Sequence, residues 1–256
     1  MDPEIAVEVK GVYKDFNTHR KATSLKDLIV YHDRKESDKI HHVLKDINFK
    51  VKKGEALAII GRNGSGKSTT LKLLAKIIRP NRGTIEINGK VACLIELGAG
   101  FHPDMTGRDN VYINASFFGI NEKEVDRRMN QIIEFSEIGD FIDERIRNYS
   151  SGMYLRLAFS VASNVDADVL LIDEILAVGD IRFQEKCFNR LQEFKNGGGT
   201  IILVTHSIEQ AERFCENTIW IEDGVIKEFG PSKEVCKKYE EAMLGEKSNE
   251  ERGNDV

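Results

Sequence analysis

One octapeptide constrains the fold of this chain more than any other feature. Residues 61–68 read Gly-Arg-Asn-Gly-Ser-Gly-Lys-Ser and fit the pattern G-x-x-x-x-G-K-[ST] without a gap. The apolar run 56–60 precedes it directly, and a segment with helically spaced apolar residues follows it. In such a strand–loop–helix unit, glycines let successive backbone N–H groups curve around a phosphate at the positive end of the helix. The octapeptide therefore predicts a phosphate-binding loop.

The side chains of this loop indicate its ligands. Lys67 has the length to reach the β and γ phosphates of a nucleotide, and the Ser68 hydroxyl can ligate Mg²⁺. We expect nucleotide contacts from eight residues, which are Gly61, Asn63, Gly64, Ser65, Gly66, Lys67, Ser68 and Thr69. A chance glycine-rich turn is the alternative, and the predicted strand and helix on either side argue against it.

Three short runs are apolar at every position, as in strands buried on both faces of a parallel sheet. They are residues 56–60, 169–172 and 201–204. Segments with helical spacing alternate with these runs, which indicates an α/β core. Residues 5–9 and 47–51 instead alternate apolar with polar side chains and predict an antiparallel sheet with one buried face.

Other segments interrupt or extend this core. Residues 97–162 predict an inserted helical subdomain, in which Asn121 and Glu124 form a capped helix start. Residues 17–42 form a polar insertion with a short amphipathic helix. Ser232 is positioned to cap a last helix. Residues 245–256 are polar, without apolar periodicity, and we expect them to be disordered.

The composition excludes several classes of function. The chain has 256 residues, of which 41% are hydrophobic, and a net charge of -5, which disfavours a basic nucleic-acid-binding surface. No apolar run approaches the ~20 residues of a membrane-spanning helix, and the first residues do not resemble a secretory signal. We therefore expect a cytosolic protein with reduced cysteines at positions 93, 187, 215 and 236.

Two adjacent carboxylates, Asp173 and Glu174, end the apolar run 169–172. In α/β sheets, ligands bind beyond the carboxyl ends of the strands. Asp173 suits binding of Mg²⁺ through water, and Glu174 suits polarising the water that attacks the γ-phosphate. A strand followed by a solvated loop would have the same sequence, so this pair alone leaves both interpretations open.

The remaining motifs resemble those of ATP-binding cassette proteins, in the order of that family. Tyr149-Ser150-Ser151-Gly152-Met153 is similar to its LSGGQ signature, although a helix cap would look the same in isolation. Asp180 stands where the D-loop of the family ends. His206 resembles the switch histidine that holds the γ-phosphate, and a surface histidine is the alternative. Phe16 stands at the A-loop position, where it would stack on adenine, or it is a core side chain.

The resemblance implies a fold and two ligands. The fold is that of a P-loop NTPase with a RecA-like α/β core, an antiparallel β subdomain and an inserted α-helical subdomain, covering residues 4–244. The implied ligands are ATP and Mg²⁺. The sequence departs from the family where its Q-loop carries Gln, because Glu96 occupies that position. Glu96 could contact Mg²⁺ or water and could transmit the nucleotide state to a partner, as could Asp180.

Several segments resemble one branch, the ATPase subunits that export lipid-linked polysaccharides such as O-antigens and teichoic acids. They are residues 96–103, 106–110, 149–153 and 176–180. This resemblance implies a homodimer in which Ser150 and Gly152 act on the partner's ATP. It also implies two copies of an integral membrane permease, a lipid-linked glycan as substrate, no nucleic acid, and peripheral attachment to the cytoplasmic face of the membrane. The insertion 17–42 stands where that branch carries a gate helix near the membrane.

We expect residues 94–110 to contact the permease, with Phe101 and His102 on that surface; packing inside the helical subdomain is their alternative role. Two rival functions remain open at this point. One is a soluble cassette ATPase that acts on nucleic acid, ribosomes or protein complexes. The other is a GTPase, because Asp104-Met105-Thr106-Gly107 mimics a DxxG switch, although no NKxD guanine-binding motif is present.

Overall fold

The computed structural model describes residues 2–18, 39–94, 97–173 and 179–253. At its N-terminal end, an antiparallel sheet has the strand order β2-β1-β4. Its strands are β1 (Ile5–Thr18), β2 (Lys39–Lys52) and β4 (Arg82–Ile87). The alternating segments 5–9 and 47–51 lie on β1 and β2 and pair with each other, which confirms their predicted structure. Most of the insertion 17–42 lies outside the described residues.

The second sheet has six strands in the order β5-β6-β7-β3-β8-β9. They are β3 (Ala56–Ile60), β5 (Val91–Leu94), β6 (Val169–Asp173), β7 (Thr200–Val204), β8 (Asn217–Glu222) and β9 (Val225–Pro231). Strands β5, β6, β7, β3 and β8 are parallel, and β9 is antiparallel to β8. The predicted α/β core with a parallel sheet is therefore confirmed.

The parallel strands are apolar throughout because both faces of the sheet are covered. On β3, Ala56, Ala58 and Ile60 pack into a core with residues of α6 and α7. The intervening Leu57 and Ile59 pack into a second core with α2 and the antiparallel sheet. Successive strand side chains point to opposite faces, so a strand between two cores must be apolar at every position.

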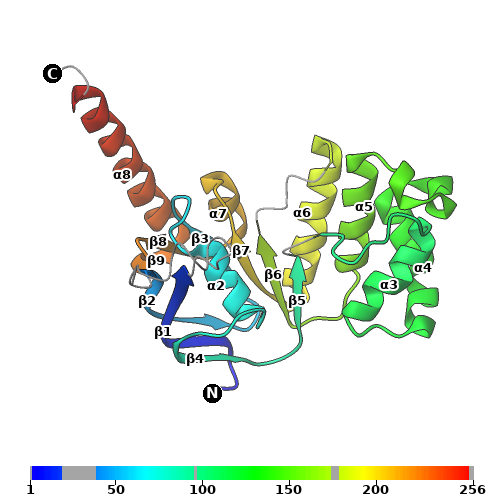
Figure 1. Ribbon diagram of the computed structural model, residues 1–256, viewed down its shortest axis with the longest axis horizontal. Helices are drawn as coiled ribbons and strands as arrows, with labels where there is room; N and C mark the ends of the chain where they lie inside the picture. The colour runs from blue at the N-terminus through cyan, green and yellow to red at the C-terminus, as the bar shows by residue number, and fades with distance from the viewer. Residues whose placement is uncertain (1, 19–38, 95–96, 174–178, 254–256) are drawn as a thin grey trace, which may run out of the picture.

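Four helices accompany this sheet. They are α2 (Lys67–Leu74), α6 (Ile181–Asn196), α7 (Ile208–Phe214) and α8 (Ser232–Gly253). In Figure 1, α8 projects away from the rest of the molecule. This helix continues to Gly253, so the structure describes most of the segment 245–256 as helix, where the sequence predicts a disordered tail. Five of the nine residues 245–253 are Glu, Lys or Arg, which are good helix formers, and polarity alone does not end a helix.

The helical subdomain lies at the end of the molecule remote from the antiparallel sheet (Figure 1). It contains α3 (Gly107–Phe117), α4 (Glu122–Ser136), two 3₁₀ turns (Gly139–Asp143 and Ile146–Asn148) and α5 (Ser151–Ala162). The Asn121 side chain accepts a hydrogen bond from the backbone N–H of Glu124, so the predicted capped start of α4 is confirmed. Within the described ranges, every helix is too short or too polar to span a bilayer.

Candidate nucleotide-binding and hydrolysis site

The loop 61–68 joins β3 to α2, as its sequence predicts. Gly61 and Gly66 have φ angles of 148° and 113°, in the region that favours glycine. A Cβ atom on Gly61 would lie 2.2 Å from the carbonyl oxygen of Ile221, and one on Gly66 would lie 2.5 Å from the side chain of Leu44. The backbone between β3 and α2 therefore has no room for side chains at these two positions.

The first turn of α2 places backbone N–H donors beside a positive charge. Its N-cap residue, Gly66, supplies no side-chain hydrogen bond, and the turn contains no acidic residue. The buried ammonium of Lys67 donates hydrogen bonds to the carbonyl oxygens of Gly61 (2.8 Å) and Arg62 (2.9 Å). Free N–H groups at a helix start, the helix dipole and a lysine ammonium together favour an anion. This arrangement fits the phosphates of a nucleotide.

The other predicted loop contacts divide into exposed and buried side chains. Asn63 and Ser68 are exposed, Thr69 is half-buried, and Gly64 has open space where a Cβ would stand. Ser65 is buried, and its hydroxyl has no hydrogen-bond partner. The exposed Ser68 hydroxyl at the start of α2 fits an Mg²⁺ ligand by its chemistry and position.

Strand register brings the other predicted groups to the same edge of the sheet. β7 lies between β3 and β6, and its Val204 is opposite both Ile59 and Asp173. The phosphate-binding loop, the segment after β7 and the carboxylate that ends β6 therefore meet at the carboxyl ends of three neighbouring strands. Asp173 is half-buried there, and His206 is exposed. Glu174 lies outside the described residues.

The signature segment starts α5 but lies away from this loop. The exposed Ser150 caps α5, since its hydroxyl accepts a hydrogen bond from the backbone N–H of Met153 (3.2 Å). A Cβ on Gly152 would meet only the Ser150 hydroxyl, at 3.8 Å. In Figure 1, β5 and β6 separate α5 from α2. The structure therefore does not bring Ser150 and Gly152 to Lys67 within one chain.

Asp180 begins α6 and links it to α5. One carboxylate oxygen accepts a hydrogen bond from the backbone N–H of Phe183 (3.0 Å), and the other accepts one from Arg156 (2.6 Å). The hydrogen bond from Phe183 and the charge of Arg156 lower the pKa of the Asp180 carboxyl. Arg156 also pairs with Glu137 at the end of α4 (3.0 Å). The Asp180 carboxylate is thus held ionised against the signature helix α5.

Phe16 lies on β1, opposite His41 of β2, and is 41% exposed. It is therefore not a core side chain. The Lys14 ammonium lies 4.9 Å from the centre of its ring. Three residues along β2 from His41, Leu44 lies against Gly66 of the loop. Three strand residues span ~10 Å, which is about the separation of the base and the β phosphate in a nucleotide, so Phe16 is at a suitable distance for the base.

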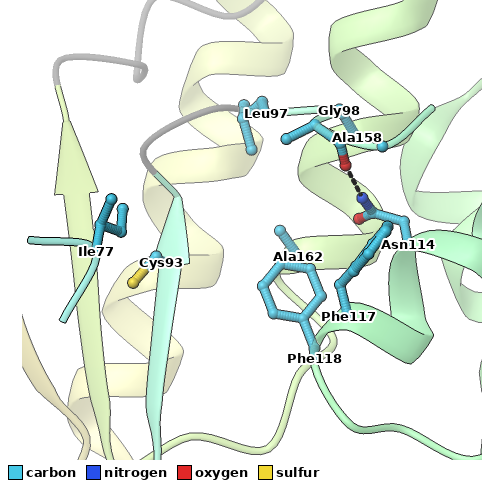
Figure 2. Close-up of a pocket in the computed structure, with 11 residues that line it drawn as sticks. Ile77, Cys93, Leu97, Gly98, Asn114, Phe117, Phe118, Ala158 and Ala162 are labelled. Atoms are coloured by element: carbon cyan, nitrogen blue, oxygen red, sulfur yellow. Dashed lines mark hydrogen bonds between the residues drawn. The ribbon is translucent and has the colours of Figure 1, made fainter. Parts of the chain in front are cut away.

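A groove of about 370 Å³ lies between the α/β core and the helical subdomain. Figure 2 shows that its wall includes Ile77, Cys93 and Phe117. Ile77 and Phe117 are 61% and 70% exposed. Burial raises the pKa of the Cys93 thiol to about 11, so this thiol is neutral near pH 7. The groove is therefore apolar and uncharged on this side.

Only part of the segment 94–110, which is expected to contact the permease, lines this groove. Leu97, Gly98, Ala99 and Gly100 line it, whereas Phe101 and His102 do not. The ring of Phe101 packs edge-on against Tyr154 at 5.2 Å, inside the helical subdomain. The ring of Phe101 therefore lies against α5, whereas His102 is exposed, and contact of residues 94–110 with a permease stays a prediction. Glu96 lies outside the described residues.

The structure also places the segment that mimics a GTPase switch. Asp104 precedes α3 in the helical subdomain and pairs with Arg147 at 3.0 Å. It does not end a strand of the parallel sheet beside the phosphate-binding loop. This position removes the structural basis for a GTPase switch at residues 104–107.

Comparisons with known proteins show the family of this chain. Residues 44–177 match the family described as "ABC transporter". The chain is 46% identical to the O-antigen export system ATP-binding protein RfbB of Klebsiella pneumoniae over 245 residues, which cover 94% of this chain and 99% of that protein. It is 38% identical to the teichoic acids export ATP-binding protein TagH of Listeria innocua over 242 residues, covering 94% of this chain and 71% of that protein.

The fold is similar to that of solved cassettes. A dimeric ATP-binding cassette in a post-hydrolysis state, bound to ADP and Pi, superposes with a TM-score of 0.71 at 23% identity, over 88% of this chain and 98% of that chain. The strand register brings the loop, Asp173 and the end of β7 to one edge of the sheet, where α/β folds bind their ligands. The chain therefore belongs to the ABC transporter family, as an ATPase subunit of the branch that contains the O-antigen and teichoic acid export proteins.

Proposed function

We propose that this chain drives export of a lipid-linked cell-surface polysaccharide across the cytoplasmic membrane by hydrolysing ATP. The observation that carries the proposal is the 46% identity to an O-antigen export ATP-binding protein over nearly the full length of both chains. The similarity to a teichoic acid export protein supports the same class of substrate. A soluble cassette ATPase that acts on nucleic acid is disfavoured by the net charge of -5.

The site suggests a division of roles in hydrolysis. Lys67 and the N–H groups at the start of α2 hold the phosphates, and Ser68 and Asp173 would hold Mg²⁺. When bound, Mg²⁺ neutralises charge that develops on the phosphate oxygens. Glu174 orients and polarises the attacking water, and His206 holds the γ-phosphate. Phe16 stacks on the base.

The distance between the two halves of the site supports a homodimer. Ser150 and Gly152 lie on α5, which β5 and β6 separate from the loop of the same chain (Figure 1). In a head-to-tail pair with C2 symmetry, each signature helix would cover the ATP on the partner's loop. The solved dimeric cassette with a similar fold is consistent with this arrangement.

We propose that two copies of an integral membrane permease bind the dimer, each in the apolar groove of one chain. Its wall joins Ile77 from the core side to Phe117 of the helical subdomain (Figure 2). An exposed isoleucine and an exposed phenylalanine beside a neutral thiol favour an apolar partner segment. Binding there would attach the chain peripherally to the cytoplasmic face of the membrane. It would also connect the partner to the Q-loop segment around Glu96.

The test uses the complex of this chain with the permease, in vesicles that contain the lipid-linked glycan. Ile77→Asp with Phe117→Asp places charges in the groove, and Phe141→Asp changes another exposed aromatic side chain, 54% accessible, outside it. We expect the double variant to lose export while the isolated subunit keeps its ATPase activity. The Phe141 variant keeps both. Normal export by the double variant would contradict the proposed contact.

A further inference from the structure

Thr205 and Ser207 flank His206, and both are hydrogen-bonded to Gln210 of α7. The Thr205 hydroxyl is buried, donates a hydrogen bond to the side-chain oxygen of Gln210 (3.1 Å) and accepts one from the backbone N–H of Ser207 (3.0 Å). The Ser207 hydroxyl accepts a hydrogen bond from the backbone N–H of Gln210 (3.2 Å). Gln210 thus holds both neighbours of His206, one through its side chain and one through its backbone.

This turn is also attached to the strand that carries the phosphate-binding loop. The backbone N–H of Thr205 donates to the carbonyl oxygen of Ile59 on β3 (3.3 Å). Thr205 is therefore fixed on three sides, by β3, by Ser207 and by Gln210. Because the backbone of residue 206 lies between two fixed residues, its position is set at the carboxyl edge of the sheet, where the loop and Asp173 meet.

We propose that Gln210 is a positioning residue for ATP hydrolysis. Its side-chain oxygen orients the Thr205 hydroxyl, and this hydroxyl in turn fixes the backbone direction of His206. Gln210 does not need to contact the nucleotide, since it acts through the two residues beside the histidine. The inference rests on the proposed role of His206 at the γ-phosphate.

A purely structural role makes a different prediction. If the side chain of Gln210 only stabilised α7, its loss would lower the melting temperature and leave the turnover of the folded protein unchanged. Loss of a positioning contact lowers kcat, because small displacements of a reacting group are costly, whereas ATP binding through the loop and Lys67 is kept. A kcat effect without a KM effect therefore separates the two roles.

The substitution pair is Gln210→Leu and Gln210→Glu, measured in the purified chain with ATP. Leucine has a similar size and removes the acceptor, whereas glutamate keeps an acceptor for the Thr205 hydroxyl. We expect Gln210→Leu to lower kcat about tenfold, with KM for ATP within about twofold of the unsubstituted protein, and Gln210→Glu to restore most of kcat. Gln192→Leu is the matched control, because it removes a glutamine hydrogen bond to Asn196 on α6, and it keeps kcat.

A second pair of substitutions tests the donor of this hydrogen bond, Thr205. Thr205→Val removes the hydroxyl at nearly constant shape, and Thr205→Ser keeps it. We expect Val to lower kcat and Ser to retain it. The double variant Thr205→Val with Gln210→Leu should lose less than the product of the two single effects, since both remove the same hydrogen bond. Full multiplicativity of the two effects would overturn the inference.

His206→Ala separates this inference from the proposed function. If His206→Ala lowers kcat but Gln210→Leu does not, the positioning role is overturned and the proposed role of His206 stands. If His206→Ala leaves kcat unchanged, the proposed role of His206 is wrong, and the positioning role fails with it. A fall in kcat for Gln210→Glu as large as that for Gln210→Leu would also overturn the inference, because the acceptor is then irrelevant.

Discussion

Lys67 and Glu174 are expected to contribute to different steps of one reaction. The ammonium of Lys67 lies over the loop carbonyls and supplies positive charge for the phosphates, so Lys67→Ala should abolish ATP binding. Glu174→Gln should keep ATP binding and lower hydrolysis by ~10² or more, the range of positioned acid–base groups. Isothermal titration and steady-state kinetics measure the two quantities. Equal loss of ATP affinity in both variants would show that these roles are wrongly assigned.

The carboxyl of Glu8 is expected to make the free energy of unfolding depend on pH. Its carboxylate is buried on the antiparallel sheet and pairs with Lys50 (2.8 Å) and Lys10 (2.9 Å). Hydrogen bonds from Lys50 and then Lys10 lower the pKa of Glu8 from 4.5 to about 2. A carboxyl whose pKa is lower in the folded state stabilises the folded protein at pH values above its pKa in the unfolded state. For Glu8 this stabilisation is lost as the pH falls toward 2.

The variant Glu8→Gln should therefore have a lower free energy of unfolding at pH 7 than the unsubstituted protein. The difference between the two proteins should shrink between pH 4.5 and about 2, where Glu8 becomes protonated. Urea unfolding at a series of pH values measures this difference. Glu86→Gln, at the opposed and exposed position of β4, is the control. A constant difference over this pH range would contradict the assignment.

At the scale of elements, Arg156 joins three helices. From α5 it pairs with Asp180 at the start of α6 and with Glu137 at the end of α4, and it stacks on Phe183 at 4.8 Å. Arg156→Met should lower the free energy of unfolding by about 1–2 kcal/mol, since charged hydrogen bonds contribute this much when partly exposed. Arg127→Met, which removes an exposed pair within α4, should change it by less than about 0.5 kcal/mol. Equal effects in urea unfolding would contradict the role of Arg156.

Elements with strong local signals were predictable from the sequence. The strands 56–60, 169–172 and 201–204 are apolar throughout because two cores cover them, and the cap at Asn121 is a local hydrogen bond. The end of α8 was not predictable in the same way, because residues 245–253 lack apolar periodicity and mix Glu, Lys and Arg, which favour helix, with two glycines, which do not.

In the candidate site, too, some residues were predictable from local sequence and others were not. The loop 61–68, Asp173 and His206 follow buried strands, so local pattern and topology were sufficient to place them at one edge. The hydrogen bond between Thr205 and Gln210 and the groove around Phe117 depend on side-chain directions. Phe101 shows the difficulty, because it belongs to the predicted segment and yet packs against Tyr154.

At the scale of the whole molecule, a shared site should make the two chains interdependent. In a dimer of one Gly152→Asp chain with one Lys67→Ala chain, both lesions can fall on the same ATP site. The other site then pairs an intact loop with an intact signature segment and should keep hydrolysis. Gly152→Asp in both chains should abolish hydrolysis, because each added carboxylate would lie near a partner's phosphates. Full activity of that homodimer would contradict a site shared between chains.

The central claim is that ATP hydrolysis by this chain drives movement of a lipid-linked glycan. The most direct measurement is ATP-dependent transfer of that glycan across vesicles containing the permease, with the unsubstituted chain compared with Glu174→Gln. We expect transfer with the unsubstituted chain, and a loss of transfer with the variant although the variant still binds ATP and assembles with the permease. Transfer at an equal rate with the variant, whose ATP hydrolysis is expected to be lower by ~10² or more, would contradict this role of hydrolysis.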